Sequence, residues 1–87
     1  MDRARTERLL QEYGWTQIKI SKPSGPVVEL HLSMSKWCED YIGSGRLEPN
    51  LMLDDQDVWY SFTWYGYWSY HFKHSKDATV FAVRWSS

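Results

Sequence analysis

The sequence predicts a small α+β domain with an antiparallel sheet of about four strands, arranged as two hairpins, and two or three short helices. Some segments alternate apolar and polar residues, others repeat apolar residues every three or four positions, and glycine or proline turns separate them. The length of 87 residues suits a single domain, residues 1–87, with a thin core. The expected fold is ferredoxin-like in character.

The N-terminal half is expected to contain a helix, a hairpin and a second helix. Residues 3–13 place apolar side chains at helical spacing and predict a short amphipathic helix. WTQIKISK at 15–22 alternates and predicts a strand, and VVELHLS at 27–33 alternates again after the turn sequence PSGP. These two strands form the first predicted hairpin. Apolar residues at helical spacing over 34–42 predict the second helix.

The aromatic segment VWYSFTWYGYWSYHF at 58–72 predicts the second hairpin. A two-residue turn at Tyr65 and Gly66 suits the positive φ of glycine and places aromatic rings on both faces of the sheet. A three-residue loop from Tyr65 to Tyr67 gathers most of the rings on one face. Turn chemistry favours the first register, and the alternating pattern favours the second.

Two further segments are less regular. The connection at 43–57 is longer than most, so we expect either a functional loop or a short element near Leu51 to Leu53. The final segment fits a strand through its β-branched residues or a helix that begins near Lys76. We favour the helix, with an extended end, over 76–85.

Charge and composition limit the classes of function. The formal net charge is −1, so no overall basic field is available for a nucleic acid. Residues 29–57 carry seven acids against two bases, and Asp54, Asp55 and Asp57 form a candidate acidic patch for a basic partner. A single cysteine, Cys38, excludes an internal disulfide, and the opening MDRARTERLL lacks the apolar core of a signal peptide. We therefore expect a cytoplasmic protein without a membrane span.

The sequence predicts no enzyme, no cofactor and no metal site. His71 and His74 lie three apart on a predicted strand and so face opposite sides. Glu29 and His31 share a face of the predicted 27–33 strand, but such polar pairs are common on exposed strands. Cys38 lies on the apolar stripe of the second helix, where a buried small hydrophobe is the expected role.

The aromatic excess points instead to a binding surface. Six tryptophans and an aromatic content of 17% exceed what one helical layer over a sheet can cover. Tyrosine and tryptophan are enriched where proteins bind each other. The predicted partner-binding residues are Trp15, Trp59, Tyr65, Tyr67, His71 and Lys73. A protein or a second copy of the chain is the expected partner, and single-stranded nucleic acid is the alternative.

Two resemblances bear on function. YGYWSYHFKHSKDATVF resembles the third strand and following helix of RNA-recognition-motif domains, through Gly66, Tyr67, Phe72, Asp77 and Ala78. That resemblance implies nucleic-acid binding on a sheet.

The whole chain resembles small tryptophan-rich accessory proteins of tailed phages, and it closes on F-x-x-x-x-D-A-x-x-F-x-x-R-W. This second resemblance implies a phage or prophage protein that binds and inhibits a host protein, as anti-CRISPR proteins do. It also implies a location in the cytoplasm of an infected or lysogenic bacterium.

Overall fold

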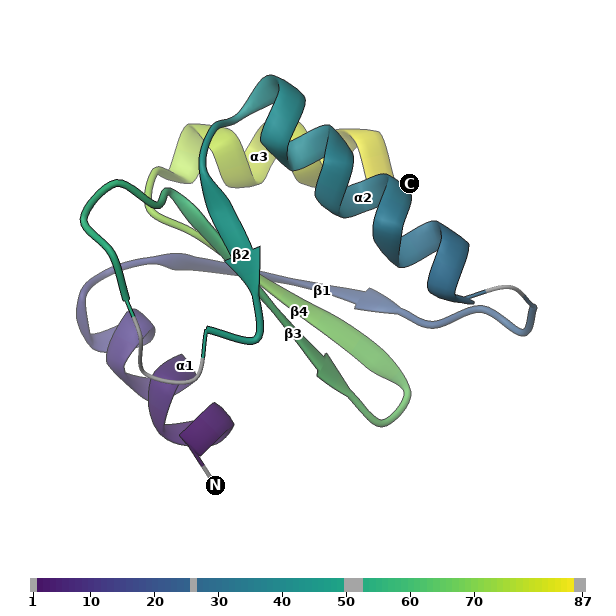
Figure 1. Cartoon of the computed structure of the whole chain (residues 1–87), viewed down its shortest axis with the longest axis horizontal. Helices are drawn as coiled ribbons and strands as arrows, with labels where there is room; N and C mark the ends of the chain where they lie inside the picture. Colours follow the sequence, from purple (N-terminus) through teal and green to yellow (C-terminus); the bar gives the residue numbers. More distant parts are fainter. Residues whose placement is uncertain (1, 26, 50–52, 86–87) are drawn as a thin grey trace.

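The computed structural model describes residues 2–25, 27–49 and 53–85, and within them it contains three helices and a four-stranded sheet (Figure 1). In chain order the elements are α1 (Asp2–Glu12), β1 (Thr16–Ser21), α2 (Val27–Tyr41), β2 (Gly45–Leu47), β3 (Trp59–Trp64), β4 (Tyr67–Phe72) and α3 (Ser75–Trp85). The predicted α+β class is confirmed. None of the described helices is long and apolar enough to cross a membrane.

The sheet is mixed, whereas the sequence predicted an antiparallel sheet of two hairpins. Its strands lie in the order β1, β4, β3, β2, and β2 runs parallel to β3. β1 pairs antiparallel with β4, which is distant in sequence, so the first predicted hairpin does not form. Parallel neighbours need a crossover, and residues 48–58 provide it. β1, α2, β3, β4 and α3 follow the first five elements of the ferredoxin-like order β-α-β-β-α-β, and the described residues add α1 before them and the short strand β2 between α2 and β3.

Residues 27–33 form the first half of α2, so the strand predicted there is wrong. Val27 and Leu30 pack against the core, whereas Val28 and Leu32 are 68% and 57% exposed. The alternating pattern of this segment also contains a helical repeat, which continues through Met34 along the same helix. One continuous helix, α2, therefore buries a single apolar stripe. A separate strand at 27–33 would interrupt that stripe.

The hairpin of β3 and β4 turns through Tyr65 and Gly66. Trp64 pairs with Tyr67, and Gly66 has a φ of +88°, in the left-handed region that glycine adopts without strain. Turn chemistry therefore predicted the register, and the alternating pattern, which favoured a three-residue loop, did not. As a consequence, aromatic rings lie on both faces of the sheet.

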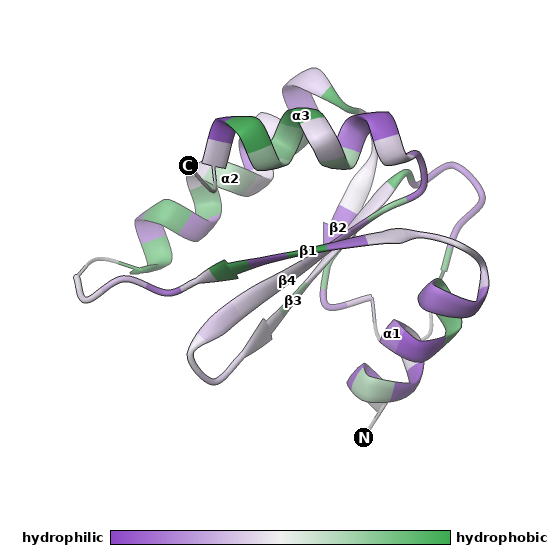
Figure 2. Cartoon of the chain, turned by 180° about the vertical axis from the view of Figure 1, so that it is seen from behind, coloured by the Kyte–Doolittle hydropathy of each residue, from purple (hydrophilic) through white to green (hydrophobic). Residues whose placement is uncertain are grey.

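Helices cover both faces of the sheet (Figures 1 and 2). On the face covered by α2 and α3, the buried residues include Met34, Cys38, Trp59, Trp68, Tyr70, Phe72 and Phe81. On the other face, Leu10 of α1 packs against Tyr60 and Phe62, with Leu53 of the crossover beside them. α1 is predominantly hydrophilic in Figure 2, and its buried hydrophobic residue is Leu10.

The remaining predictions are confirmed in part. The helix at 3–13 and the strand at 15–22 appear as α1 and β1. The last segment is helical from Ser75 to Trp85, without the extended end that was expected. The 43–57 connection does contain a short element, but this is β2; residues 50–52 lie outside the described part of the chain, and Leu53 has no regular secondary structure.

Candidate functional site

Two of the six residues expected on the partner surface are inside the protein. Trp59 is 1% exposed, and its indole N–H donates a hydrogen bond to the carbonyl oxygen of Gly43 at 2.9 Å. His71 is fully buried beneath α1. The prediction assumed one open sheet face, but helices cover both. Trp59 and His71 are therefore corrected from surface to core residues.

The other four residues lie at opposite ends of the sheet. Tyr65 is fully exposed at the hairpin turn, and Tyr67 next to it is half-buried, with the Lys19 ammonium 5.1 Å from its ring centre. Trp15 and Lys73 lie at the other end, because β1 begins where β4 ends. The structure thus separates the predicted surface into two smaller ones.

A cavity of about 440 Å³ opens at the Trp15 end of the sheet. Residues from the end of α1, the start of β1, the crossover and the end of β4 line it. Five of the nine predicted site residues meet there, namely Trp15, Lys73, Asp54, Asp55 and Asp57. Sequence reasoning did not select the other lining residues, Leu10, Tyr13, Leu53, Tyr60 and His74. We take this cavity as the candidate functional site.

Aromatic rings form one wall of the cavity. Trp15 stacks on Tyr60 with ring centres 5.2 Å apart and planes inclined by 16°. The Tyr60 hydroxyl donates a hydrogen bond to Asp57 Oδ2 at 3.0 Å and accepts one from the Asp54 backbone N–H at 2.9 Å. Burial, together with the hydrogen bond to Asp57, raises the pKa of Tyr60 above its ordinary value. Tyr60 therefore remains a neutral donor that joins the sheet to the crossover.

The three aspartates of the cavity differ in what they contact. Asp57 is 7% exposed, and its Oδ2 lies 3.0 Å from Arg46 Nε. Asp54 accepts a hydrogen bond from the Gln56 backbone N–H at 2.8 Å and lies 3.8 Å from Arg46. Asp55 is exposed and makes no ion pair or side-chain hydrogen bond within the described part of the chain. The predicted acidic patch thus contains one carboxylate free for a ligand, whereas the buried Asp57 is paired with the partly exposed Arg46.

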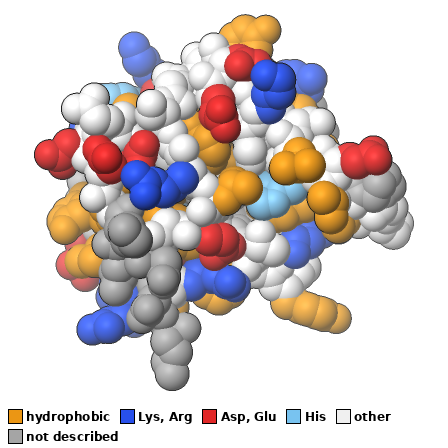
Figure 3. Space-filling view, in the orientation of Figure 1, with side chains coloured by type: hydrophobic (Ala, Val, Ile, Leu, Met, Phe, Trp, Pro, Cys, Tyr) orange, Lys and Arg blue, Asp and Glu red, His pale blue; other side chains and the backbone are white. Residues whose placement is uncertain are grey.

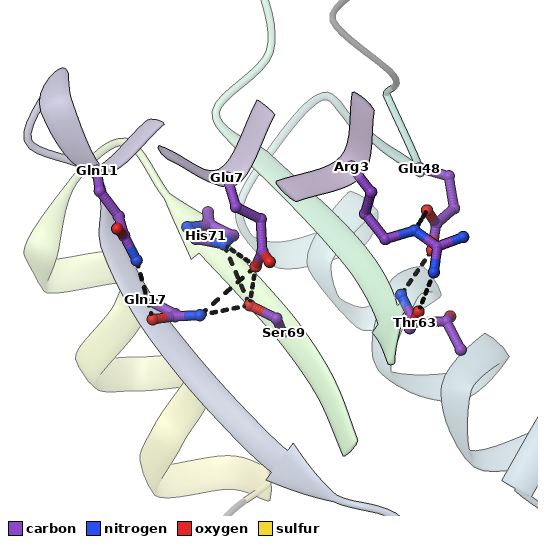
Figure 4. Close-up of polar contacts among 8 residues, drawn as sticks. All are labelled: Arg3, Glu7, Gln11, Gln17, Glu48, Thr63, Ser69 and His71. Carbon is purple, nitrogen blue, oxygen red and sulfur yellow. Dashed lines mark hydrogen bonds and ion pairs between the residues drawn. The ribbon is translucent and has the colours of Figure 1, made fainter. Parts of the chain in front are cut away.

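A polar network attaches α1 to the sheet next to the cavity (Figure 4). Glu7 Oε2 lies 2.6 Å from His71 Nε2 and accepts a hydrogen bond from the Ser69 hydroxyl at 2.5 Å. The Gln17 amide donates to Ser69 Oγ at 2.8 Å. Burial opposes ionisation of Glu7, but the hydrogen bonds from His71 and Ser69 outweigh it, so the pKa of Glu7 lies below its ordinary value. The network therefore holds an ionised carboxylate against the sheet.

Arg3 attaches the first turn of α1 in the same way. Its Nε lies 2.8 Å from Glu48 Oε2, and its terminal N–H donates to the carbonyl oxygen of Thr63 at 2.8 Å (Figure 4). The guanidinium also lies over the Trp64 ring, 5.2 Å from its centre. Polar contacts thus hold the first turn and the middle of α1 against the sheet.

Ser69, His71 and Glu7 contain the side chains of a hydrolytic triad but not its geometry. In a triad the histidine contacts the nucleophile through one ring nitrogen and the acid through the other. Here Ser69 Oγ, at 3.1 Å, and Glu7 both contact Nε2, and Nδ1 is buried without a partner in the structure as described. Ser69 and His71 are also fully buried. The arrangement holds α1 in place and offers no access to a substrate.

Other reactive side chains have structural environments. Burial raises the pKa of the Cys38 thiol to about 12, so the thiol stays protonated. Glu29 and His31 were expected on one strand face, but they lie in α2, where residues two apart do not face each other. His31 Nε2 instead lies 3.2 Å from Ser61 Oγ. Over residues 2–25, 27–49 and 53–85, no group of three or more His, Cys, Asp or Glu is placed to hold a metal ion.

The structure also exposes an apolar surface that the sequence did not predict. Val28 and Leu32 on α2 are 68% and 57% exposed, and Leu47 on β2 is 39% exposed. Leu32 and Leu47 line one groove of about 490 Å³ between these elements. Figure 3 shows hydrophobic side chains (orange) gathered around a histidine (pale blue) on this side of the molecule. Sequence reasoning missed the surface because it predicted a strand over 27–33, whereas these residues form the start of α2.

Comparisons with known protein families, curated proteins and solved structures find no match for this chain. Its fold and surfaces define it as a small α+β protein with one mixed aromatic and acidic cavity and one apolar groove among the surfaces described above.

Proposed function

We propose that the protein binds and inhibits another protein, and that the cavity at the Trp15 end of the sheet is the contact site. The observation that carries this proposal is the composition of the cavity, which combines aromatic walls with the free carboxylate of Asp55. Tyrosine and tryptophan bury a large area at low entropic cost and dominate the energy of many protein interfaces. A partner side chain that enters the cavity would contact both kinds of group.

The partner we propose is a bacterial host protein, and a defence component is the first to test. This choice follows the resemblance to small phage accessory proteins of the anti-CRISPR type. The protein would act in the cytoplasm of the infected or lysogenic cell. In this proposal the protein inhibits its target by covering a functional surface, without chemistry of its own.

Binding of single-stranded nucleic acid is the second candidate, because cations and aromatic rings adjoin at the hairpin end. Lys19 lies 5.1 Å from the Tyr67 ring, Lys22 lies 5.7 Å from the Trp68 ring, and Tyr65 is fully exposed. Bases stack on such rings, and lysines contact phosphates. The net charge of −1 and the aspartates of the cavity oppose an extended phosphate contact. Protein binding is therefore the better-supported function.

An affinity purification from host lysate tests the proposal. The tagged protein is incubated with lysate with and without nuclease, and retained proteins are identified by mass spectrometry. We expect a stoichiometric, nuclease-resistant partner that is lost or weakened by Trp15→Ala, with a cost of about 2 kcal/mol if Trp15 is a central contact. Inhibition is then measured as loss of the partner's activity in a purified assay.

Three variants identify the surface that is used. Trp15→Ala alters the cavity, Leu32→Ser alters the apolar groove, and Tyr65→Ala alters the hairpin turn. If only Leu32→Ser abolishes capture, the cavity is not the contact site. Recovery of nuclease-sensitive complexes that weaken steeply with salt would favour the nucleic-acid function. A mass in solution of twice the 10.4 kDa chain, in place of any captured partner, would identify a second copy of the chain as the partner.

A further inference from the structure

We infer that the cavity accepts a basic side chain, arginine or lysine, of the partner protein. The identity of the partner rests on the proposed function, whereas the chemistry of the ligand follows from the cavity itself. Two independent features of the lining support a cation: the aromatic wall and the balance of charges.

The aromatic wall offers faces on which a cation can lie. Tyr13, Trp15 and Tyr60 all line the cavity. Trp15 is stacked on Tyr60, which fixes the plane of its ring, and Tyr13 is 65% exposed at the rim. Lysine and arginine cations are attracted to aromatic faces within about 6 Å, most strongly to tryptophan. Tyr60 is fully buried, so a guanidinium that enters the cavity meets the half-buried Trp15, whose plane Tyr60 fixes, and the exposed Tyr13.

The charges of the lining favour a cation over an anion. Three aspartates line the cavity against one lysine, Lys73. Arg46 contacts Asp57 and Asp54 but is not itself part of the lining, so these two carboxylates are partly neutralised. Asp55 makes no ion pair or side-chain hydrogen bond over the described ranges, so its carboxylate oxygens are left to accept hydrogen bonds from a ligand. A carboxylate beside aromatic rings matches both the charge and the donors of arginine.

Lys73 provides a test in which a basic ligand and an acidic ligand give opposite results. Its side chain is exposed, lines the cavity and makes no ion pair with a described residue. Its ammonium repels a cation that enters the cavity and attracts an anion. Removing the charge of Lys73 should therefore strengthen the binding of a basic ligand, whereas removing the charge of Asp55 should weaken it. An acidic or phosphorylated ligand would give the reverse for both variants.

The experiment is an NMR titration of the ¹⁵N-labelled protein with N-acetyl-arginine amide, with N-acetyl-citrulline amide as the uncharged control of similar shape. We expect arginine, at millimolar concentration, to shift the Trp15 indole N–H and the Asp55 amide, and citrulline to shift them much less. Asp55→Asn should weaken arginine binding about threefold to tenfold, and Lys73→Met should strengthen it about twofold or more. Glu29→Gln, which removes an exposed carboxylate on α2, should leave the affinity unchanged.

Because Asp55 and Lys73 are both exposed, their variants are expected to fold like the natural protein. Equal shifts with arginine and citrulline, equal effects of Asp55→Asn and Glu29→Gln, or weaker binding to Lys73→Met would each overturn the inference. A captured partner that is indifferent to Asp55→Asn overturns the inference and leaves the proposed function in place. Charge-selective arginine binding without any captured partner supports the inference and counts against the proposed function.

Discussion

Gly45→Ala tests how tightly the edge strand β2 packs on its neighbour. A Cβ atom built on Gly45 would lie 2.3 Å from two ring carbons of Trp59 and 2.4 Å from its carbonyl oxygen, whereas ordinary contacts begin at 3.4 Å. The indole is also fixed by its 2.9 Å hydrogen bond to Gly43, so it cannot turn aside without losing that bond. Overpacking costs about 1–3 kcal/mol and a lost hydrogen bond about 1 kcal/mol. We expect Gly45→Ala to lower the free energy of unfolding by about 2–4 kcal/mol.

Urea denaturation, followed by tryptophan fluorescence, measures this change, and Gly14→Ala is the matched control. Gly14 has a φ of +88°, and a Cβ atom on it would meet nothing within 4 Å, so its substitution introduces backbone strain without a clash. That strain costs about 1–2 kcal/mol. If Gly45→Ala is no more destabilising than Gly14→Ala, β2 does not lie against Trp59 in the manner described.

Three further predictions concern the core and the network under α1. Phe81 is fully buried with its ring centre 4.6 Å from that of Tyr70, so Phe81→Ala should cost about 3–5 kcal/mol in the same urea assay; a loss below about 1 kcal/mol would contradict this packing. The pKa of Glu7 is lower in the folded protein than its ordinary value of 4.5, so its contribution to stability is present above pH 4.5 and is lost as the pH falls below it. Urea titrations across that range should show a smaller acid dependence for Glu7→Gln, and equal slopes would refute the contribution. The Cys38 thiol, with a pKa of about 12, should react with iodoacetamide only after unfolding, as read from the mass of the protein in native buffer and in urea.

The sequence predicted the elements whose patterns have one interpretation. The helix at the N-terminus and the strand that follows were found close to their predicted bounds, whereas the C-terminal segment, which also fitted a strand, was found as the helix that we favoured. VVELHLS at 27–33 was mistaken for a strand because its apolar residues fit a period of two as well as the helical period. The pairing of β1 with β4 and the parallel β2 depend on long-range contacts that no local pattern specifies. The mixed topology could therefore not be predicted.

The candidate site was predicted only in part, because its assembly also depends on long-range contacts. Aromatic and acidic residues stand out in a composition, so Trp15 and Asp55 were selected before their positions were known. Their neighbour Tyr60 was not selected, because its stacking on Trp15 depends on the fold. Burial of His71 was missed because the prediction had one helical layer, whereas α1 forms a second layer over it. Burial of Trp59 was missed because the two-residue turn places it on the face of Tyr70 and Phe72, which α2 and α3 cover.

α1 links the buried network to the cavity, and this link leads to one more prediction. Leu10 and Tyr13 line the cavity, and Glu7, one turn before Leu10, is bound to His71. α1 is predominantly hydrophilic, so its position depends strongly on this polar contact (Figure 2). Glu7→Gln should therefore weaken arginine binding in the NMR titration, although Glu7 does not line the cavity.

Backbone amides of α1 should exchange with solvent faster in Glu7→Gln, while those of β3 and β4 keep their protection, because only the attachment of the helix is altered. Exposed Glu12→Gln, in the last turn of the same helix, is the matched control, since Glu12 makes no side-chain hydrogen bond or ion pair with a described residue. Unchanged affinity in Glu7→Gln, together with faster exchange in α1, would show that the packing of Leu10 alone fixes the cavity wall. Loss of affinity in Glu7→Gln but not in Glu12→Gln would assign the shape of the cavity to the contact between Glu7 and His71.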